Sequence, residues 1–416
     1  MLKMNQLQSE QIITSDGRVN RLKIILILGA LSALGPLTID MYLPGWPIMT
    51  KEFGASTSAI QLTLTACLLG LAFGQLFIGS LSDTHGRRMP LLLSLIVYTI
   101  ASILCAFAPN IWALVIFRFI QGFAGSAGLV ISRACIRDLY SGTELTRYYA
   151  MVVLVMGVAP IFAPVIGGQL LHFFPWQGIF IALFFISIGL FLIVLTSLPE
   201  TLSKQRKSKG GLKNMVLIFG SLCRNRIFMG YALTQGLMTA SLFAYISGSS
   251  FVYQEVFGVS PQVFSILFGL NGFGYILATQ IGGRLAGKVK ETMLLYIGLG
   301  IGLFGGSLFM LVVLISAGLP FIIVSLFLIV SSIGLVNPSC FSLAMQNQAG
   351  NAGSASALLG LMPFLFGALV APIVGHGGSG TALPMAVLIL LAEVGAILVF
   401  LVMVQLKKKN EVLQST

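Results

Sequence analysis

The chain has 416 residues, of which 57% are hydrophobic and only 9% carry a charge. Soluble domains carry about 25% charged residues, so this composition excludes a soluble enzyme and predicts an integral membrane protein. The net charge of +12 does not indicate nucleic-acid binding, because the basic residues lie at the ends of apolar segments and in one linker, without an aromatic-interleaved basic face.

Twelve apolar segments, each long enough to cross a bilayer as a helix, follow one another along the chain. The first six lie at 22–47, 58–80, 89–108, 111–134, 148–171 and 176–198, and the second six at 227–250, 262–284, 292–316, 319–342, 355–376 and 383–405. The sequence therefore predicts an all-α membrane protein built from two six-helix bundles. The expected divisions are a tail over 1–21, an N-terminal bundle over 22–198, a basic linker over 199–226, a C-terminal bundle over 227–405 and a tail over 406–416.

Basic residues are distributed unevenly between the two sides of the predicted membrane. If the N-terminus lies inside, 22 of the 24 Lys and Arg residues fall in the inner loops and tails. The outer loops contain Lys51 alone, and Arg118 lies within the fourth segment. Because basic loops stay in the cytoplasm, both termini are predicted to be cytoplasmic.

The first apolar segment contains a carboxylate, Asp40, between two prolines. Asp40 lies six residues from Trp46, and Arg118 lies seven residues from Ile111, so both are roughly 10 Å below the outer surface at 1.5 Å per residue. Charges in hydrocarbon are costly unless they are paired, and equal depth allows these two to pair. Each residue also has an alternative interpretation. Asp40 could serve only to hydrogen-bond backbone groups freed beside a proline, and the Arg118 side chain could extend to the outer interface.

The loop after the second segment, residues 79–91, reads GSLSDTHGRRMPL. It resembles the signature loop of the major facilitator superfamily, G-x-L-x-D-(R/K)-x-G-R-(R/K)-x-x-L, with Thr84 at a position that is usually basic. The resemblance implies that this loop closes the cytoplasmic side when the cavity faces outward. Asp83 is then expected near Gly353 and Ser354, where a helix N-terminus favours an anion. The full set of expected gate residues is Gly79, Asp83, Gly86, Arg87, Arg88 and Asp138, with Arg87 or Arg88 near Asp138.

Two further segments contain motifs that resemble those of the same superfamily. Residues 114–122 match L-x-x-x-R-x-x-Q-G, which proton-coupled members carry, and include Arg118. Residues 159–170 resemble the antiporter motif G-x-x-x-G-P-x-x-G-G, with Ala159 and Ala163 in place of its first two glycines. The residues that carry this second match are Pro160, Pro164, Gly167 and Gly168. A packing kink without a role in transport direction is the alternative.

Three shorter segments narrow the resemblance: PLTIDMYLP at 36–44, LPET at 198–201 and AGSASALLG at 352–360. Together they resemble the Bcr/CflA family of bacterial drug:proton antiporters. This resemblance implies a monomer of the bacterial inner membrane that exports small, often amphipathic antibiotics in exchange for protons, with Asp40 and Arg118 coupling proton and substrate. Proton-coupled import, or export of an endogenous metabolite, stays open.

The energy source and the substrate cavity can also be inferred. A G-x-x-x-x-G-K-(S/T) loop is absent, so we expect a proton gradient and no cofactor, and the cysteines lack metal-ligand spacing. Patterns of an integral-membrane enzyme, such as HxxxH or GxSxG, are also absent.

Glu393 is expected to be hydrogen-bonded between helices. The cavity is expected to be lined by Met41, Tyr42, Gln121, Tyr231, Gln235, Tyr245 and Asn271.

Overall fold

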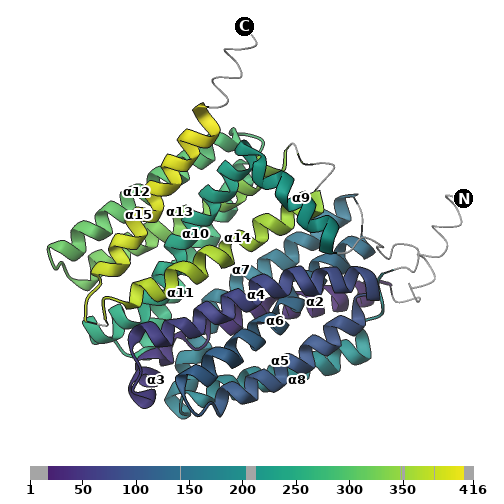
Figure 1. Ribbon diagram of the computed structural model, residues 1–416, viewed down its shortest axis with the longest axis horizontal. Coiled ribbons are helices and arrows are strands. Elements are labelled where there is room, and N and C mark those ends of the chain that lie inside the picture. Colours follow the sequence, from purple (N-terminus) through teal and green to yellow (C-terminus); the bar gives the residue numbers. More distant parts are fainter. Residues whose placement is uncertain are drawn as a thin grey trace, which may run out of the picture.

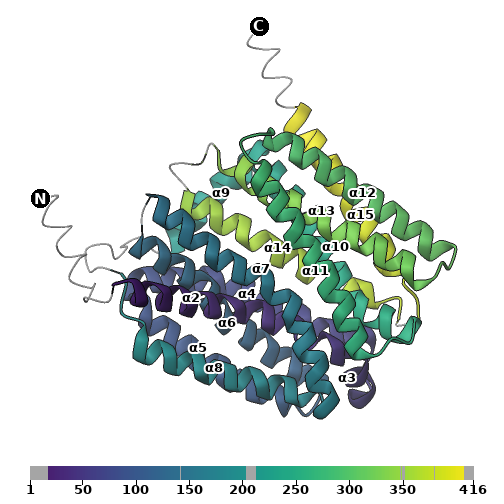
Figure 2. The ribbon, with the colours of Figure 1, turned by 180° about the vertical axis from the view of Figure 1, so that it is seen from behind.

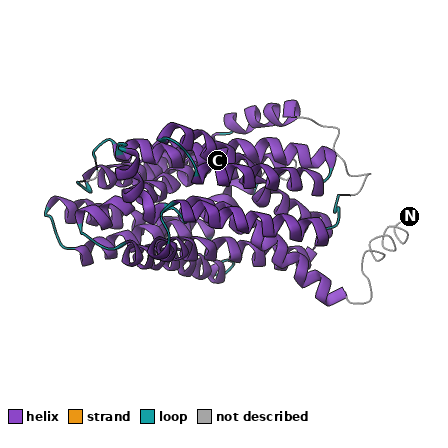
Figure 3. Ribbon diagram, turned by 90° about the horizontal axis from the view of Figure 1, so that it is seen from below, coloured by secondary structure: helices purple, strands orange, loops and turns teal. Residues whose placement is uncertain are grey.

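The fold is entirely helical in the part of the chain that the structure describes (Figure 3). The structure, a computed structural model, describes residues 17–140, 142–202, 212–346, 348, 352–378 and 380–406. Twelve helical segments among these residues are long and apolar enough to cross a membrane, which confirms the predicted fold class. The tails 1–16 and 407–416 lie outside the described residues. So do most of the basic residues of the predicted linker, which are Lys204, Arg206, Lys207 and Lys209.

The first half of the chain supplies six of these spans. Its helices are α2 (Gly17–Asp40), η1 (Leu43–Gly45), α3 (Trp46–Phe53), α4 (Thr57–His85), α5 (Arg88–Ala106), α6 (Ile111–Leu139), α7 (Gly142–Phe173) and α8 (Gln177–Ser197). Side-chain caps begin two of them, because Ser56 accepts a hydrogen bond from the Ala59 N–H and Asn110 accepts one from the Ala113 N–H. A left-handed glycine, Gly54, ends α3.

The second half begins with a short helix, α9, that precedes the last six spans. Its helices are α9 (Leu212–Arg224), α10 (Arg226–Phe251), η3 (Val252–Val256), α11 (Pro261–Leu285), α12 (Glu291–Leu314), α13 (Leu319–Met345), α14 (Ala352–Gly375), α15 (Leu383–Val399) and η5 (Phe400–Gln405). Asn225 and Ser260 cap α10 and α11 in the same manner as the caps of the first half. The predicted spans therefore match the observed helices closely.

The first span differs from the expectation at its outer part. The expected segment, 22–47, was continuous, whereas α2 ends at Asp40 and η1 and α3 continue the chain. Pro44 lacks the N–H that would bond the Asp40 carbonyl, and Pro47 lacks the one that would bond the Leu43 carbonyl, so the regular helix stops here. Asp40 consequently lies at a helix break and not inside a regular helix.

The two halves lie side by side, with α4 against α14 and α7 against α11 (Figures 1 and 2). In Figure 1 the first half runs from purple through blue to teal, and the second half runs from teal through green to yellow. The beginning of α2 and the end of η5 lie at one end of the bundle, which we call the basic end, and α3 lies at the opposite end, the α3 end.

The hydrophobic cores show where the halves are joined. At the α3 end one core contains residues of both halves, including Tyr42 and Trp46 of the first and Tyr245 and Phe264 of the second. Two other cores lie toward the basic end: one belongs entirely to the first half, and the other belongs to the second half apart from Ala72 and neighbouring residues of α4. The molecule is therefore closed between its halves at the α3 end.

Candidate functional site

Asp40 is a buried carboxylate at the break that ends α2. It is 4% exposed, and its Oδ1 has no hydrogen-bond partner among the described residues. A buried polar atom without a partner is costly, so its presence here requires an explanation. Its neighbours Met41 and Tyr42 belong to the core that both halves share at the α3 end, which places the carboxylate near the boundary between the two halves.

Arg118 of α6 is completely buried beside this break. Its guanidinium donates hydrogen bonds to Gln121 Oε1 at 2.6 Å and to the Thr38 carbonyl at 2.9 Å. Its central carbon lies 4.2 Å from the centroid of the Tyr42 ring, a cation–π geometry that stabilises a desolvated cation. Polar and aromatic groups therefore hold Arg118 in place of a carboxylate.

The expected pair between Asp40 and Arg118 is not formed in this structure. In the described part of the chain, Arg118 has no carboxylate among its partners, and the two ion pairs observed there both belong to Arg87. The break at the end of α2 explains the difference, because it turns the Thr38 carbonyl and the Tyr42 ring toward Arg118. The alternative that Arg118 reaches the outer interface does not fit this structure, because its side chain is buried.

The residues expected to line the cavity fall into two groups. Met41, Tyr42 and Tyr245 belong to the core that both halves share at the α3 end. Asn271 joins them, because its amide donates to the Tyr245 hydroxyl at 3.0 Å. Gln235, on α10, is 7% exposed and its Oε1 has no partner among the described residues.

Two of the expected cavity residues lie elsewhere. Gln121 lies inside the first half, where it accepts from Arg118 and donates to Ser102 at 2.8 Å. Tyr231 packs in the core of the second half, with its ring 6.2 Å from the Phe400 ring. Helix packing, which the sequence pattern does not specify, turns both side chains away from the boundary between the halves.

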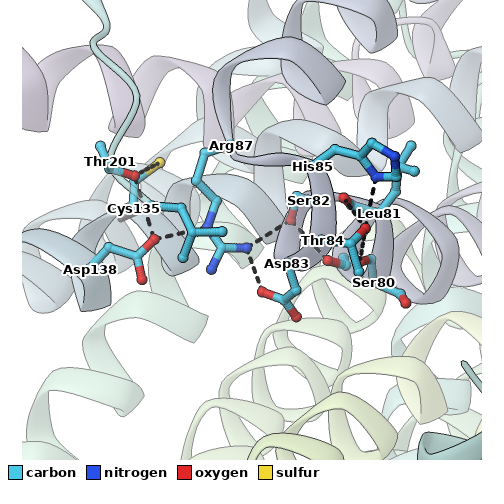
Figure 4. Close-up of polar contacts among 12 residues, drawn as sticks. Ser80, Leu81, Ser82, Asp83, Thr84, His85, Arg87, Cys135, Asp138 and Thr201 are labelled. Atoms are coloured by element: carbon cyan, nitrogen blue, oxygen red, sulfur yellow. Dashed lines mark hydrogen bonds and ion pairs between the residues drawn. The ribbon is translucent and has the colours of Figure 1, made fainter. Parts of the chain in front are cut away.

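The loop between α4 and α5 forms a charge cluster at the basic end (Figure 4). Arg87 donates to Asp83 at 2.5 Å, to Ser82 at 2.9 Å and to Asp138 at 2.8 Å. Burial lowers the pKa of Arg87, but hydrogen bonds to Asp138 and Asp83 outweigh burial and hold the pKa above its ordinary value. Of the two arginines expected near Asp138, the structure selects Arg87, because Arg88 donates to the Leu195 carbonyl.

The expected contact of Asp83 with the beginning of α14 is not made in this structure. Asp83 is paired with Arg87, and its side chain is 45% exposed. Space around Gly353 is open. Since this contact was expected for an outward-facing cavity, its absence agrees with closure of the halves at the opposite, α3 end.

Glu200, which the sequence analysis gave no role, lies just after the end of α8 and holds the same loop. Its carboxylate accepts the backbone N–H groups of Arg87 at 2.8 Å, Arg88 at 3.2 Å and Leu202 at 3.0 Å. Gly86 has a φ of +103°, and a Cβ at this glycine would lie 2.5 Å from Glu200 Oε2. The signal in the sequence was the acid directly after the sixth apolar segment.

Replacing Glu200 by Gln is expected to lower the melting temperature in detergent at pH 7. Partial burial raises the pKa of Glu200, but its backbone donors outweigh burial and hold the pKa below its ordinary value. The stabilisation is therefore complete above the ordinary glutamate pKa of about 4.3 and is lost as the pH falls through the lowered folded pKa. Because Glu200 is exposed and solvent screens its charge, we expect the substitution to reduce the free energy of unfolding by only about 1 kcal/mol.

Melting curves of wild type and Glu200→Gln between pH 7 and pH 4 test this expectation. The gap between the two melting temperatures should narrow toward the acid end of this range. A gap that stays constant with pH would show that the charge of Glu200 contributes nothing to stability.

The motif of the fifth segment lies where α7 meets both α2 and the other half. Pro160 and Pro164 are inside α7. A Cβ added at Gly167 would lie 1.8 Å from the Met41 carbonyl oxygen, and one at Gly168 would lie 2.4 Å from Ser265 Oγ of α11. These two glycines therefore allow the break after Asp40 and the beginning of α11 to approach α7 closely.

Glu393 lies inside the second half, away from the boundary. It is 1% exposed and accepts a hydrogen bond from Ser241 of α10 at 3.2 Å, while its Oε2 has no hydrogen-bond partner among the described residues. A Cβ added at Gly306 of α12 would lie 2.0 Å from this oxygen. The expected position between helices is therefore observed, at the junction of α10, α12 and α15.

We expect Glu393→Gln to retain both stability and transport. Glutamine has nearly the volume of glutamate and keeps an oxygen that accepts from Ser241. Glu393→Leu removes this acceptor and leaves the buried Ser241 hydroxyl without a partner, which is expected to reduce the free energy of unfolding by about 1–3 kcal/mol. The melting temperature in detergent should fall accordingly. Loss of pH-dependent transport in a stable Glu393→Gln protein would assign Glu393 a role in proton coupling.

Comparisons with known proteins agree with this architecture. The family profile described as Major Facilitator Superfamily matches residues 28–372. The chain is 44% identical over 383 residues to an uncharacterized MFS-type transporter, YdgK, of Bacillus subtilis, covering 91% of this chain and 95% of that protein. It is 31% identical to a bicyclomycin resistance protein homolog of Haemophilus influenzae, and the match covers 87% of this chain and 91% of that protein. The crystal structure of the nucleoside transporter NupG shares the fold, with a TM-score of 0.74 at 15% identity over 91% of this chain and 99% of that one.

Proposed function

The chain belongs to the Major Facilitator Superfamily, and on this basis we propose that it exports small, drug-like organic molecules from the bacterial cytoplasm in exchange for protons. The basic end faces the cytoplasm in this proposal, in agreement with the distribution of Lys and Arg. Because the halves are closed at the α3 end, the structure then represents a state that is closed to the outside.

The position of Asp40 carries the proposal. Exchange requires a site at which the proton and the substrate exclude each other, either directly or through the conformation of the protein. Asp40 is buried, has an oxygen without a partner and lies at a helix break near the boundary of the halves. A carboxylate inside a membrane protein marks a proton or substrate pathway in many transporters.

Arg118 completes the site without pairing with Asp40 in this state. Its charge is stabilised by the Thr38 carbonyl, by Gln121 and by the Tyr42 ring. Since Tyr42 is two residues from Asp40, a movement of the break would alter the distance between the two charges. Release of the proton from Asp40 would then be coupled to the arrangement of α2 against α6.

The direction of transport rests on the motif of α7 and on one relative. Gly167 and Gly168, at positions that resemble the antiporter motif, let α7 approach the Met41 carbonyl of its own half and Ser265 of the other half. The name of the Haemophilus relative refers to bicyclomycin resistance, which export would provide. Proton-coupled import or export of an endogenous metabolite is the alternative, and it would use the same carboxylate.

Everted membrane vesicles separate these functions. A resistance profile of an efflux-deficient bacterium that expresses the chain identifies the drugs to use, with bicyclomycin among those tested. Respiration acidifies the vesicle interior, and an antiporter is then expected to accumulate labelled drug until a protonophore dissipates the gradient. Release of preloaded compound upon acidification would instead establish proton symport.

A further inference from the structure

Among the described residues, six hydrogen bonds join the two halves at the α3 end, and each of them runs from a side chain to a backbone carbonyl. Their donors are Ser58, Gln61 and Thr65 on α4, Ser250 on α10, Gln254 on η3 and Gln262 on α11. Their acceptors are the carbonyls of Pro372, Ser247, Ala368, Leu43, Pro44 and Gly168. We call this set the α3-end gate. It contains no ion pair among its members.

Two of these acceptors have a proline four residues later, so each lacks the i+4 donor of a regular helix, and we call such a carbonyl released. In an α-helix the carbonyl of residue i accepts the N–H of residue i+4, and proline has no N–H. Pro47 is at i+4 from Leu43, and Pro372 is at i+4 from Ala368. Ser250 donates to the Leu43 carbonyl at 2.7 Å, and Thr65 donates to the Ala368 carbonyl at 3.1 Å.

The two contacts are arranged reciprocally across the boundary. Leu43 is in the first half and receives its donor from the second, whereas Ala368 is in the second half and receives its donor from the first. Leu43 also accepts the Trp46 N–H in the η1 turn, but a carbonyl oxygen has two lone pairs. Each half therefore supplies one released carbonyl and one hydroxyl to the gate.

A third released carbonyl lies within one half. Pro338 interrupts the hydrogen bonds of α13 at Gly334, and Thr279 of α11 donates to the Gly334 carbonyl at 3.1 Å. The chemistry is the same as that between Thr65 and Ala368. Because α11 and α13 belong to the same half, this contact does not have to break when the halves move apart.

A released carbonyl suits a contact that must form and break in every cycle. The released Ala368 carbonyl accepts a hydroxyl when the gate is closed and water when it is open, and the Leu43 carbonyl, which keeps the Trp46 N–H, makes the same exchange through its second lone pair. The exchange of a hydroxyl for water has a small net free energy. Neither partner is charged, so the contact does not depend on pH.

We propose that Pro47 and Pro372 are gate prolines, whose released carbonyls bind Ser250 and Thr65 and thereby set the equilibrium between the closed and the open α3 end. The proposal rests on the alternation of the two halves in the proposed function. It does not depend on the substrate or on the direction of transport, so a test by conformation alone separates its failure from failure of the proposed function.

Distance measurements between spin labels at the α3 end test the proposal on the full-length protein in detergent. Phe107 at the end of α5 and Leu314 at the end of α12 are 72% and 65% exposed and belong to different halves. They are replaced by labelled cysteines in a Cys223→Ser background, because Cys223 is exposed and the other four cysteines are buried. Double electron–electron resonance then measures the ratio of short to long distances.

Ser250→Ala and Thr65→Val are each expected to shift this ratio toward the long distance by about fivefold, which corresponds to the loss of about 1 kcal/mol. Matched controls lose a hydroxyl that bonds within its own half. Ser249→Ala removes a bond to the Ile246 carbonyl of the same helix, and Thr279→Val removes the contact with Gly334. These controls are expected to leave the distance ratio unchanged.

The role of proline is tested by restoring the missing donor. Pro372→Ala returns an N–H to the Ala368 carbonyl, so Thr65→Val in this background is expected to shift the ratio by less than about twofold. An equal effect of Thr65→Val with and without Pro372 would overturn the role of the proline. Distance distributions of Ser250→Ala and Thr65→Val that match those of the controls would overturn the gate itself.

Discussion

Replacing Asp40 by Asn is expected to reduce drug accumulation driven by the proton gradient to the level of vesicles that lack the protein. Asparagine keeps the volume and much of the hydrogen-bonding capacity of aspartate, but it cannot bind and release a proton. Because Oδ1 of Asp40 has no hydrogen-bond partner among the described residues, the variant is expected to fold and insert normally. Transport in everted vesicles is the measurement.

Two controls accompany Asp40→Asn. Binding of labelled drug to the purified variant is expected to persist, since the apolar and aromatic surface around Tyr42 and Tyr245 is unchanged. Glu393→Gln neutralises the other carboxylate that is buried within the spans and is expected to transport normally. Transport by Asp40→Asn with the pH dependence of wild type would place the proton site elsewhere, and Glu393 would be the next residue to examine.

Gly167→Ala is expected to abolish transport and to destabilise the protein. Its new Cβ would lie 1.8 Å from the Met41 carbonyl oxygen, a backbone atom that can move only if the break after Asp40 moves. Overpacking of this kind costs about 1–3 kcal/mol. Because α7 is displaced from the end of α2, the geometry of Asp40 changes as well. The melting temperature in detergent and drug transport by the same preparation measure both effects.

Gly189 on α8 provides the matched control for this substitution. A Cβ at Gly189 would meet no atom within 4 Å, and alanine favours a helix over glycine by about 1 kcal/mol. Gly189→Ala is therefore expected to transport normally with an unchanged or higher melting temperature. Normal transport by Gly167→Ala would contradict the close approach of α7 to the break and, with it, the role assigned to the motif.

The sequence by itself determined the number, order and approximate limits of the membrane-spanning helices. A helix that crosses hydrocarbon needs about 20 apolar residues, and this requirement is local, so it can be read without knowing the neighbouring helices. The loop at 79–91 predicted one of its partners, because Arg87 or Arg88 was expected near Asp138 and Arg87 pairs with it, whereas Asp83 pairs with Arg87 and not with the beginning of α14.

Only the tertiary structure decided which side chains meet inside the bundle. Equal depth made a pair of Asp40 and Arg118 possible, but the break after α2 and the rotation of α6 gave Arg118 the Thr38 carbonyl and the Tyr42 ring instead. Rotation also took Gln121 and Tyr231 away from the boundary. The orientation of a helix depends on the packing of all its neighbours, and in an almost uniformly apolar segment the hydropathy pattern does not record it.

The gate shows the same division between sequence and structure. The prolines at 47 and 372 are plain in the sequence, and each predicts a carbonyl released from its helix. The donors that bind these carbonyls, Ser250 and Thr65, are more than 200 residues away in the chain. Glycines such as Gly167 and Gly168 allow the close approach of helices that brings donors and acceptors together. The sequence thus determined where backbone acceptors are released, and the packing of one half against the other determined what binds them.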